Sequence, residues 1–417
     1  MTTGFSPRAK TDSGPLSRRA FVTGTSAAAL GLSIVSPQAV RGAPANSKIR
    51  LGLVGCGNRG NWITDLFLQH GGYTMEAVAD YFRDRVDQVG DRFQVPSDRR
   101  FTGLAGYRRL VEQELDAVVI QSPPYFHPAQ AAAAVDAGKH VFLAKPIAVD
   151  VPGSRSVEAS GRKATAEGLC FLVDYQTRVD EHYLECIRRV HEGAIGDLVF
   201  GEALYHAGIP WMRQIRYMRD EPDNPETRLR AWGLDRVMSG DVITEQNVHT
   251  LDVMSWIMDQ PPLSAWGTGD RKVRDFGDCY DTFSLVFRYP NRVGITFSSR
   301  QFEGHGTQPD GIRNRMFGTL GVLETAYGGA TLIRGENFYR GGSSPGIFRE
   351  GAVRNIATFH TDIQEGRHEN PTVAPSVRSN LVSILGRQAA YTGDCITWET
   401  LLQSEERLEA DLRRLKS

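Results

Sequence analysis

The chain has 417 residues, of which 41% are hydrophobic and 23% charged, and its formal net charge at pH 7 is −1. This length exceeds what one ordinary hydrophobic core organises, so we expect two domains with the composition of a soluble globular enzyme. A net charge so close to zero gives no electrostatic basis for binding nucleic acid or an anionic membrane.

The first 45 residues have the pattern of an export signal. Arg18 and Arg19 precede a run from Ala20 to Val40 that has no charged residue, and small residues at 43–45 offer a cleavage site. This order is typical of the twin-arginine pathway. We predict a signal peptide at 1–45, recognition by the twin-arginine export machinery, a periplasmic or exported mature protein, and no stable membrane span after signal removal. The alternative is a disordered cytosolic leader.

Residues 49–60 have the pattern of a buried strand followed by a glycine turn. The stretch 49–54 is dense in aliphatic residues, and Gly55, Gly57 and Gly60 have the G-x-G-x-x-G spacing. In a dinucleotide site these glycines allow a tight turn, close approach to a pyrophosphate and close packing of the next helix, in that order. We predict that the cofactor is bound by Gly55, Gly57, Asn58, Arg59 and Gly60. A glycine turn without a ligand is the alternative.

The second predicted strand, residues 75–80, ends in an acid. Asp80 follows Gly55 by about 25 residues, close to the distance at which a carboxylate reaches the adenosine ribose. Because a carboxylate there repels a 2′-phosphate, we predict that the cofactor is NAD rather than NADP. Free NAD is scarce outside the cytoplasm, so we expect the dinucleotide to be bound tightly and exported with the folded chain.

Strands and helices alternate through the rest of the first domain. We predict helices at 61–69, 84–93, 107–114, 127–138 and 153–167, and strands at 117–120, 140–143 and 169–174. This alternation indicates an α/β Rossmann domain at 46–174 with a doubly wound parallel sheet. Ligands of such sheets lie beyond the C-terminal strand ends, so we place around one crevice Asp80, Ser122, Pro123, His127 and Lys145. Of these, Ser122, Pro123, His127 and Lys145 are further predicted cofactor contacts.

Three stretches carry a resemblance to a known family. They are GCGNRG at 55–60, S-P-P-x-x-H at 122–127 and G-K-H-V-F-L-A-K-P at 138–146. With them the chain resembles the Gfo/Idh/MocA family of oxidoreductases, named for glucose-fructose oxidoreductase and inositol dehydrogenase, over nearly all of the sequence after Lys48. The resemblance implies that Lys145 reaches the substrate near the nicotinamide; a surface lysine is the alternative. The family's usual Glu-Lys-Pro has Ala144 in place of the glutamate here, which leaves open how the charge and position of Lys145 are set.

Antiparallel strands dominate the predicted second domain, residues 175–417. A strand at 198–206 is followed by strand pairs at 282–289 with 292–299 and at 313–317 with 321–325. We expect a surface loop at 335–351 and closing helices at 355–364, 376–391 and 398–415. The resemblance implies an α+β domain with a mostly antiparallel, open-faced sheet. Its uncovered face would form the contact of a homodimer or homotetramer.

The segment 239–256 is predicted to carry the catalytic side chains. Glu245 and His249 have helical i, i+4 spacing, which places both on one helical face. The resemblance implies Asp-x-x-x-His here, with the histidine as general acid/base for the hydroxyl proton, and we expect Glu245 to orient His249. Imidazole suits this role because its pKa lies near operating pH. The alternatives are a core histidine and half a metal site, but no third ligand is evident, so no metal is predicted.

The segment 211–232 mixes aromatic residues with five arginines. Aromatic rings stack on sugar faces, and arginine binds carboxylates through two hydrogen bonds, so a charged sugar such as a uronate is one interpretation. A solvated insertion is the other, because four acidic residues lie among the arginines. We predict that a small carbohydrate substrate is bound by Arg178, Trp211, Arg213 and Asn247.

These residues lead to three hypotheses about function. The first is an NAD-dependent oxidoreductase of a sugar, polyol or glycoside, in which hydride passes to the nicotinamide while His249 takes the hydroxyl proton beside Lys145. The second is a glycoside-cleaving enzyme that oxidises C3 with the same bound NAD, eliminates the aglycone, adds water and returns the hydride. The third is a cofactor-retaining binding protein without turnover.

Overall fold

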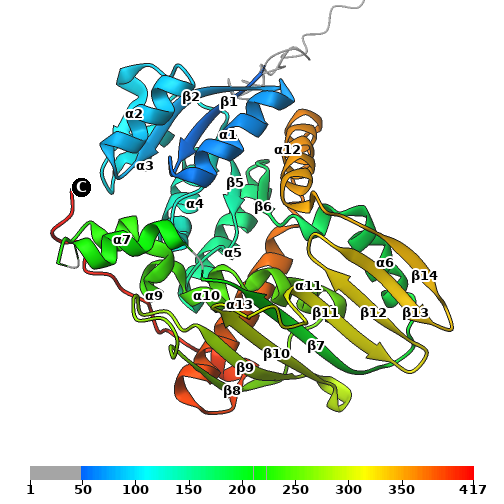
Figure 1. Cartoon of the computed structure of the whole chain (residues 1–417). Helices are drawn as coiled ribbons and strands as arrows, with labels where there is room; N and C mark the ends of the chain where they lie inside the picture. Colours follow the sequence, from blue (N-terminus) through cyan, green and yellow to red (C-terminus); the bar gives the residue numbers. More distant parts are fainter. Residues whose placement is uncertain (1–47, 210, 222) are drawn as a thin grey trace, which may run out of the picture. The chain divides into compact units, whose positions relative to one another are not determined.

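Six parallel strands form the first sheet of the computed structural model, which describes residues 48–209, 211–221 and 223–417 (Figure 1). They are β1 (Ile49–Val54), β2 (Tyr73–Asp80), β3 (Arg100–Thr102), β4 (Ala117–Ile120), β5 (His140–Ala144) and β6 (Phe171–Asp174), in the spatial order β3-β2-β1-β4-β5-β6. The order reverses between β1 and β4, and ligands bind beyond the C-terminal strand ends at such a point. The predicted doubly wound parallel sheet is confirmed. The predicted export signal lies outside the described residues.

Both faces of this sheet are buried. On β4, Val118 and Ile120 belong to one apolar cluster, while Ala117 and Val119 belong to another. Strands covered on both faces are continuously hydrophobic, as this one is. The covering helices are α1 (Asn58–His70), α2 (Arg83–Arg92), α3 (Gly106–Val111), α4 (His127–Asp136) and α5 (Val151–Ala166). These match the predicted helices, although α3 ends three residues earlier than expected.

The second sheet has nine strands in the described residues, in the order β14-β13-β12-β11-β7-β10-β9-β8-β15. They are β7 (Leu198–Ala207), β8 (Ser264–Asp270), β9 (Thr282–Arg288), β10 (Gly294–Gln301), β11 (Gly311–Gly318), β12 (Gly321–Ala326), β13 (Ala330–Gly335), β14 (Tyr339–Ser343) and β15 (Ile396–Thr397). Only β7 and β10 pair in parallel, so the predicted mostly antiparallel sheet is confirmed. The predicted surface loop at 335–351 is wrong. It contains β14, whose Tyr339 pairs with Ile333, and the start of a helix.

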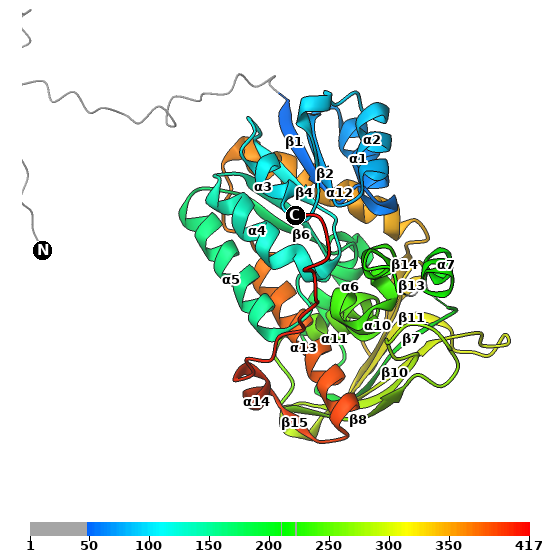
Figure 2. The ribbon, with the colours of Figure 1, turned by 90° about the vertical axis from the view of Figure 1, so that its left-hand side faces the viewer.

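The helices of this part are α6 (Glu181–His191), α7 (Met212–Asp220), α8 (Thr227–Arg230), α9 (Arg236–Ser239), α10 (Asp241–Glu245), α11 (Val248–Met258), α12 (Ile347–Glu365), α13 (Val373–Thr392) and α14 (Trp398–Leu402). The predicted closing helix at 398–415 is wrong, because α14 ends at Leu402. The following segment, red in Figure 2, runs along the first domain. There the N–H of Lys416 donates to the Tyr81 hydroxyl at 3.2 Å, and Leu412 and Leu415 pack in a cluster with Phe82. The apolar side chains of this segment are thus partly buried without forming a helical stripe.

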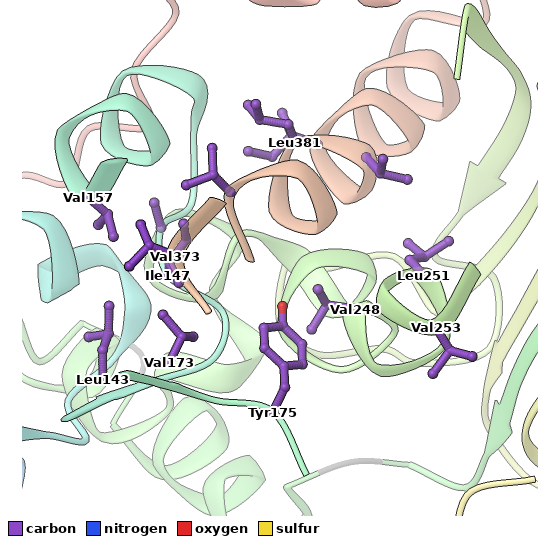
Figure 3. Close-up of a cluster of buried hydrophobic side chains, with 14 of the residues drawn as sticks. Leu143, Ile147, Val157, Val173, Tyr175, Val248, Leu251, Val253, Val373 and Leu381 are labelled. Carbon is purple, nitrogen blue, oxygen red and sulfur yellow. The ribbon is translucent and has the colours of Figure 1, made fainter. Parts of the chain in front are cut away.

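Two long helices join the second part of the chain to the first sheet. α12 packs on α1, and the Tyr73 hydroxyl donates to the Ile356 carbonyl at 2.8 Å. α13 packs on α5, where Asn380 Nδ2 donates to the Ala148 carbonyl at 3.1 Å. Figure 3 shows the shared apolar core, with side chains from β5, β6, α5, α11 and α13, among them Leu143, Val173, Val157, Val248 and Leu381. This core sets the ends of β5 and β6 relative to α11.

None of the helices in the described residues is long and apolar enough to span a membrane.

Candidate active site

The glycine turn between β1 and α1 has the geometry that a dinucleotide needs. A Cβ on Gly60 would lie 1.9 Å from the carbonyl oxygen of Gly55, so only glycine lets α1 approach the strand this closely. Gly55 has a φ of +97°, which favours glycine. A Cβ on Gly57 would have Arg85 Nη1, at 4.0 Å, as its nearest neighbour, so this side of the turn is open. The turn fits a dinucleotide whose phosphates meet the N-terminal N–H groups of α1.

Replacing Gly60 by alanine is expected to weaken NAD binding by about tenfold or more, because the added methyl group displaces α1 from the phosphate site. Calorimetric titration of the purified protein measures the dissociation constant. Gly208→Ala is the matched control, since a Cβ on Gly208 has no neighbour within 4 Å. An unchanged dissociation constant in Gly60→Ala contradicts the assignment of this turn.

One cavity lies beyond the ends of β1, β2 and β4, and its walls include Gly55, Asp80, Ser122, Pro123 and Arg85. Asp80 accepts from the N–H of Cys56 at 2.8 Å and from the N–H of Phe82 at 3.0 Å. Burial raises the pKa of Asp80, and the positive charge of Arg85 opposes the shift. Arg85 is not among the cofactor residues predicted from the sequence. Its position in the first turn of the helix after Asp80 is the signal that could have identified it.

His127 lies between two loops rather than in a cavity. Its Nδ1 is 2.8 Å from the Pro146 carbonyl oxygen, and its Nε2 is 2.8 Å from the Ser122 carbonyl oxygen. Burial lowers the pKa of His127 to about 4, and the two carbonyl oxygens oppose the shift. The prediction that His127 contacts the cofactor is therefore corrected: it bridges the loops that follow β4 and β5 and so positions Ser122 and Lys145.

Lys145 lies in a second cavity of about 480 Å³, not in the cavity that holds Asp80. It follows β5 directly, and its ammonium donates to the Glu245 carbonyl oxygen at 2.5 Å and lies 3.3 Å from Glu245 Oε1. Both side chains are 11% exposed. Burial lowers the pKa of Lys145, and the charge of Glu245 opposes the shift. Lys145 is therefore a positioned, shielded cation at the C-terminal edge of the sheet.

His249 lines the same cavity, but Glu245 does not orient it. The expected continuous helix is interrupted: α10 ends at Glu245, α11 begins at Val248, and Glu245 binds Lys145 instead. The Nδ1 of His249 is buried without a hydrogen-bond partner among the described residues. Burial lowers the pKa of His249 well below its ordinary value, and the cations Lys145 and Arg59 add to the shift. No three His, Cys, Asp or Glu side chains within the described ranges come together as a metal site.

Arg59, which lines this cavity, forms an ion pair with Asp174. The Asp174 side chain is fully buried and also accepts from Asn355 Nδ2 at 2.7 Å. Asp174 ends β6 and pairs in register with Ala144, at the end of β5. The Asp174 carboxylate thus lies on the strand next to Ala144, the position at which the resemblance implies a glutamate. We missed Asp174, although an acid at the end of a parallel strand is the signal that identified Asp80.

The predicted substrate-binding residues separate into two groups. Trp211 lines the cavity of Lys145 and also a third cavity at the start of α1, and Arg213 lines only the third of these. Arg178 and Asn247 are not among the described residues that line these cavities, and their role in binding substrate stays a prediction. The guanidinium of Arg178 binds the buried carboxylate of Asp252 at 2.8 to 3.0 Å, and Asn247 is fully buried.

The third cavity lies next to the glycine turn. Gly57, Asn58 and Arg59 line it together with arginines from α2, α7 and α8, namely Arg85, Arg213, Arg216 and Arg230. Positive guanidinium groups at a helix N-terminus suit phosphate groups. The arginines of the segment 211–232 that enter this cavity therefore face the position that a cofactor pyrophosphate would take, rather than the sugar.

The chain is similar to several known proteins. The 1,5-anhydro-D-fructose reductase of Ensifer adhaerens is 23% identical over 298 residues, which cover 69% of this chain and 81% of that protein. A glycosyl hydrolase family 109 protein of Shewanella baltica is 26% identical over 222 residues. This match covers 48% of this chain and 48% of that protein, so the chain spans about half the length of this relative. A structure of scyllo-inositol dehydrogenase from Lactobacillus casei with NAD(H) and scyllo-inositol has a TM-score of 0.65 at 19% identity and covers 84% of this chain and 99% of that chain.

Two family models match the chain directly. The model of the oxidoreductase family with an NAD-binding Rossmann fold matches residues 49–174, and that of the Gfo/Idh/MocA C-terminal domain matches residues 183–324. These ranges contain the glycine turn, Lys145, Glu245 and His249. The NAD-binding Rossmann fold predicted from the glycine spacing is confirmed, and the chain belongs to the Gfo/Idh/MocA family of oxidoreductases.

Proposed function

We propose that the chain is an NAD-dependent oxidoreductase that acts on a hydroxyl group of a sugar, polyol or glycoside. The observation that carries the proposal is the cavity in which Lys145, Glu245 and a partly buried His249 meet beside the glycine turn. When bound at the turn, NAD supplies the hydride acceptor for a carbinol carbon. Gly55, Gly57, Asn58, Arg59, Gly60, Asp80, Ser122 and Pro123 are the residues we assign to holding it.

His249 and Lys145 have different roles in the transfer of the hydroxyl proton. Because burial lowers the pKa of His249, its imidazole is neutral near pH 7 and can accept the hydroxyl proton. The Lys145 ammonium donates a hydrogen bond to the hydroxyl oxygen and stabilises the negative charge that develops there. Glu245 holds the ammonium in place through its carbonyl and its carboxylate.

The choice of NAD over NADP follows from Asp80. Its carboxylate repels a 2′-phosphate, whereas Arg85 in the same cavity attracts one. We propose that Asp80 decides the preference, and parallel titrations with NAD and NADP test this. Twin-arginine export, an exported location, tight retention of NAD, the domain boundaries 46–174 and 175–417, and the homodimer or homotetramer stay predictions.

Glycoside cleavage through transient oxidation by bound NAD is the second candidate. The similarity to a protein named for a glycosyl hydrolase family favours it, although that match covers about half of each chain. The same residues serve both reactions, because each begins with loss of hydride and hydroxyl proton from one carbinol. The two differ in whether NADH accumulates.

One experiment separates these functions. The purified protein is denatured to identify any released dinucleotide, and the intact protein is incubated with sugars, polyols and p-nitrophenyl glycosides, with and without added NAD. NADH formed from a sugar or polyol supports the oxidoreductase. Nitrophenol released without added NAD and without net NADH supports glycoside cleavage. Bound NAD without turnover supports the binding protein, and absence of both bound nucleotide and NAD binding overturns the assignment of the glycine turn.

A further inference from the structure

Two aromatic side chains lie at the catalytic cavity and have no part in the proposed proton chemistry. Trp62 on α1 and Phe348 on α12 line the cavity together with Lys145 and His249. The two helices lie side by side, blue and orange in Figure 1, and the rings stack with centroids 4.7 Å apart and an interplanar angle of 21°. Phe348 nevertheless remains 51% exposed. A stacked aromatic pair with an open surface in a cavity is suited to contact with a ligand.

A charge network holds this aromatic pair in place. The Arg59 guanidinium lies 5.4 Å from the Trp62 ring centroid and 5.7 Å from the Phe348 ring centroid. Arg59 is bound by the buried carboxylate of Asp174, which also accepts from Asn355 on α12. The network therefore connects α1, β6 and α12. Because Arg59 contacts both rings and is itself held by Asp174, a ligand that stacks on them does not have to order them first.

We propose that Trp62 and Phe348 form a subsite for a second, neutral ring joined to the reacting sugar, so that the substrate is a glycoside with a ring on each side of the linkage. The inference rests on the proposed function and narrows its substrate class. The second ring is a sugar that presents its C–H face or an aromatic aglycone, and both chemistries stack on aromatic side chains.

The charges at the subsite favour a neutral ring. The Arg59 charge is matched by Asp174, and the Lys145 charge by Glu245. A carboxylate on the second ring would thus lose hydration without meeting an unpaired cation among these residues. A free monosaccharide held at Lys145 and His249 would leave the aromatic pair exposed to water. The cavity of about 480 Å³ lies within the range of about 300 to 1,000 Å³ typical of small-molecule sites.

The test compares matched glycosides on the full-length protein with NAD bound. Methyl glycosides, phenyl glycosides and disaccharides that share the same reacting sugar are measured for binding by calorimetry and for turnover. The wild type is expected to prefer the two-ring ligands. Phe348→Ala and Trp62→Ala are each expected to weaken binding of those ligands by about two- to tenfold and to leave the methyl glycosides unchanged. Comparison of the disaccharides with the phenyl glycosides shows whether the subsite binds a sugar ring or an aromatic ring.

Two variants control for unspecific effects. Phe348→Tyr keeps the ring and should retain the preference. Phe338→Ala removes a phenylalanine that is 64% exposed and is not among the described residues lining the cavity, so it should have no effect. Equal weakening of methyl and two-ring ligands, absence of a wild-type preference, or failure of every glycoside to bind overturns the subsite. Preferential binding of two-ring ligands without hydride transfer would keep the subsite and reject the proposed function.

Discussion

Replacement of His249 by asparagine is expected to lower kcat by about 10²- to 10⁴-fold, because the variant loses the group that accepts the substrate hydroxyl proton. KM should change much less, since Lys145 and the cavity walls remain. Steady-state kinetics with the best substrate of the panel measures both constants. The same substitution at His305, which is exposed on a loop, is the matched control and should leave both constants unchanged. A kcat within a few-fold of the wild type would remove His249 from the mechanism.

The pH dependence of kcat/KM follows from the same site. Burial lowers the pKa of His249, so the imidazole stays neutral and active down to a pH well below 6.5, and activity falls only when it becomes protonated. Burial also lowers the pKa of Lys145, so the alkaline loss of activity should begin below pH 10.5. A pH profile of the wild type and of His249→Asn checks this. The acid limb should be absent from the residual activity of the variant.

Replacement of Asp174 by alanine is expected to lower the free energy of unfolding by about 3 kcal/mol. The change leaves the Arg59 guanidinium without its buried carboxylate and removes one of the two acceptors of the Asn355 amide, which keeps the Tyr175 carbonyl. Because Arg59 also lies beside Trp62, the variant should in addition weaken ligand binding at the cavity. Urea denaturation monitored by circular dichroism measures the stability change.

Two further variants make the Asp174 result specific. The double variant Asp174→Ala with Arg59→Met removes both charges and should recover much of the lost stability, since an unpaired buried charge costs more than a missing pair. Glu158→Ala breaks a surface ion pair with Arg162, whose side chains are 39% and 68% exposed, and should cost about 0.5 kcal/mol or less. Equal losses in the single and double Asp174 variants would show that the charge on Arg59 is not the cause.

Local patterns account for what was predictable in the site. The strand, the glycine turn and the acid at the end of the next strand lie within one βαβ unit, so their spacing encodes their geometry. His249 and Lys145 were identified by resemblance and do line one cavity. The predicted link between Glu245 and His249 failed because i, i+4 spacing places residues on one face only where the helix is continuous, and here the helix ends at Glu245.

The sequence by itself determined the Rossmann fold, the mostly antiparallel second sheet and the place of the dinucleotide turn, because periodicity and turn residues act over a few positions. The tertiary structure alone decided the partners of the charged groups. Glu245 meets Lys145 across 100 positions and Asp174 meets Arg59 across 115 positions, through strand order and helix packing. It also brought Trp62 against Phe348 from two helices far apart in the chain. Such pairs depend on how whole elements pack, and no local pattern of residues carries that information.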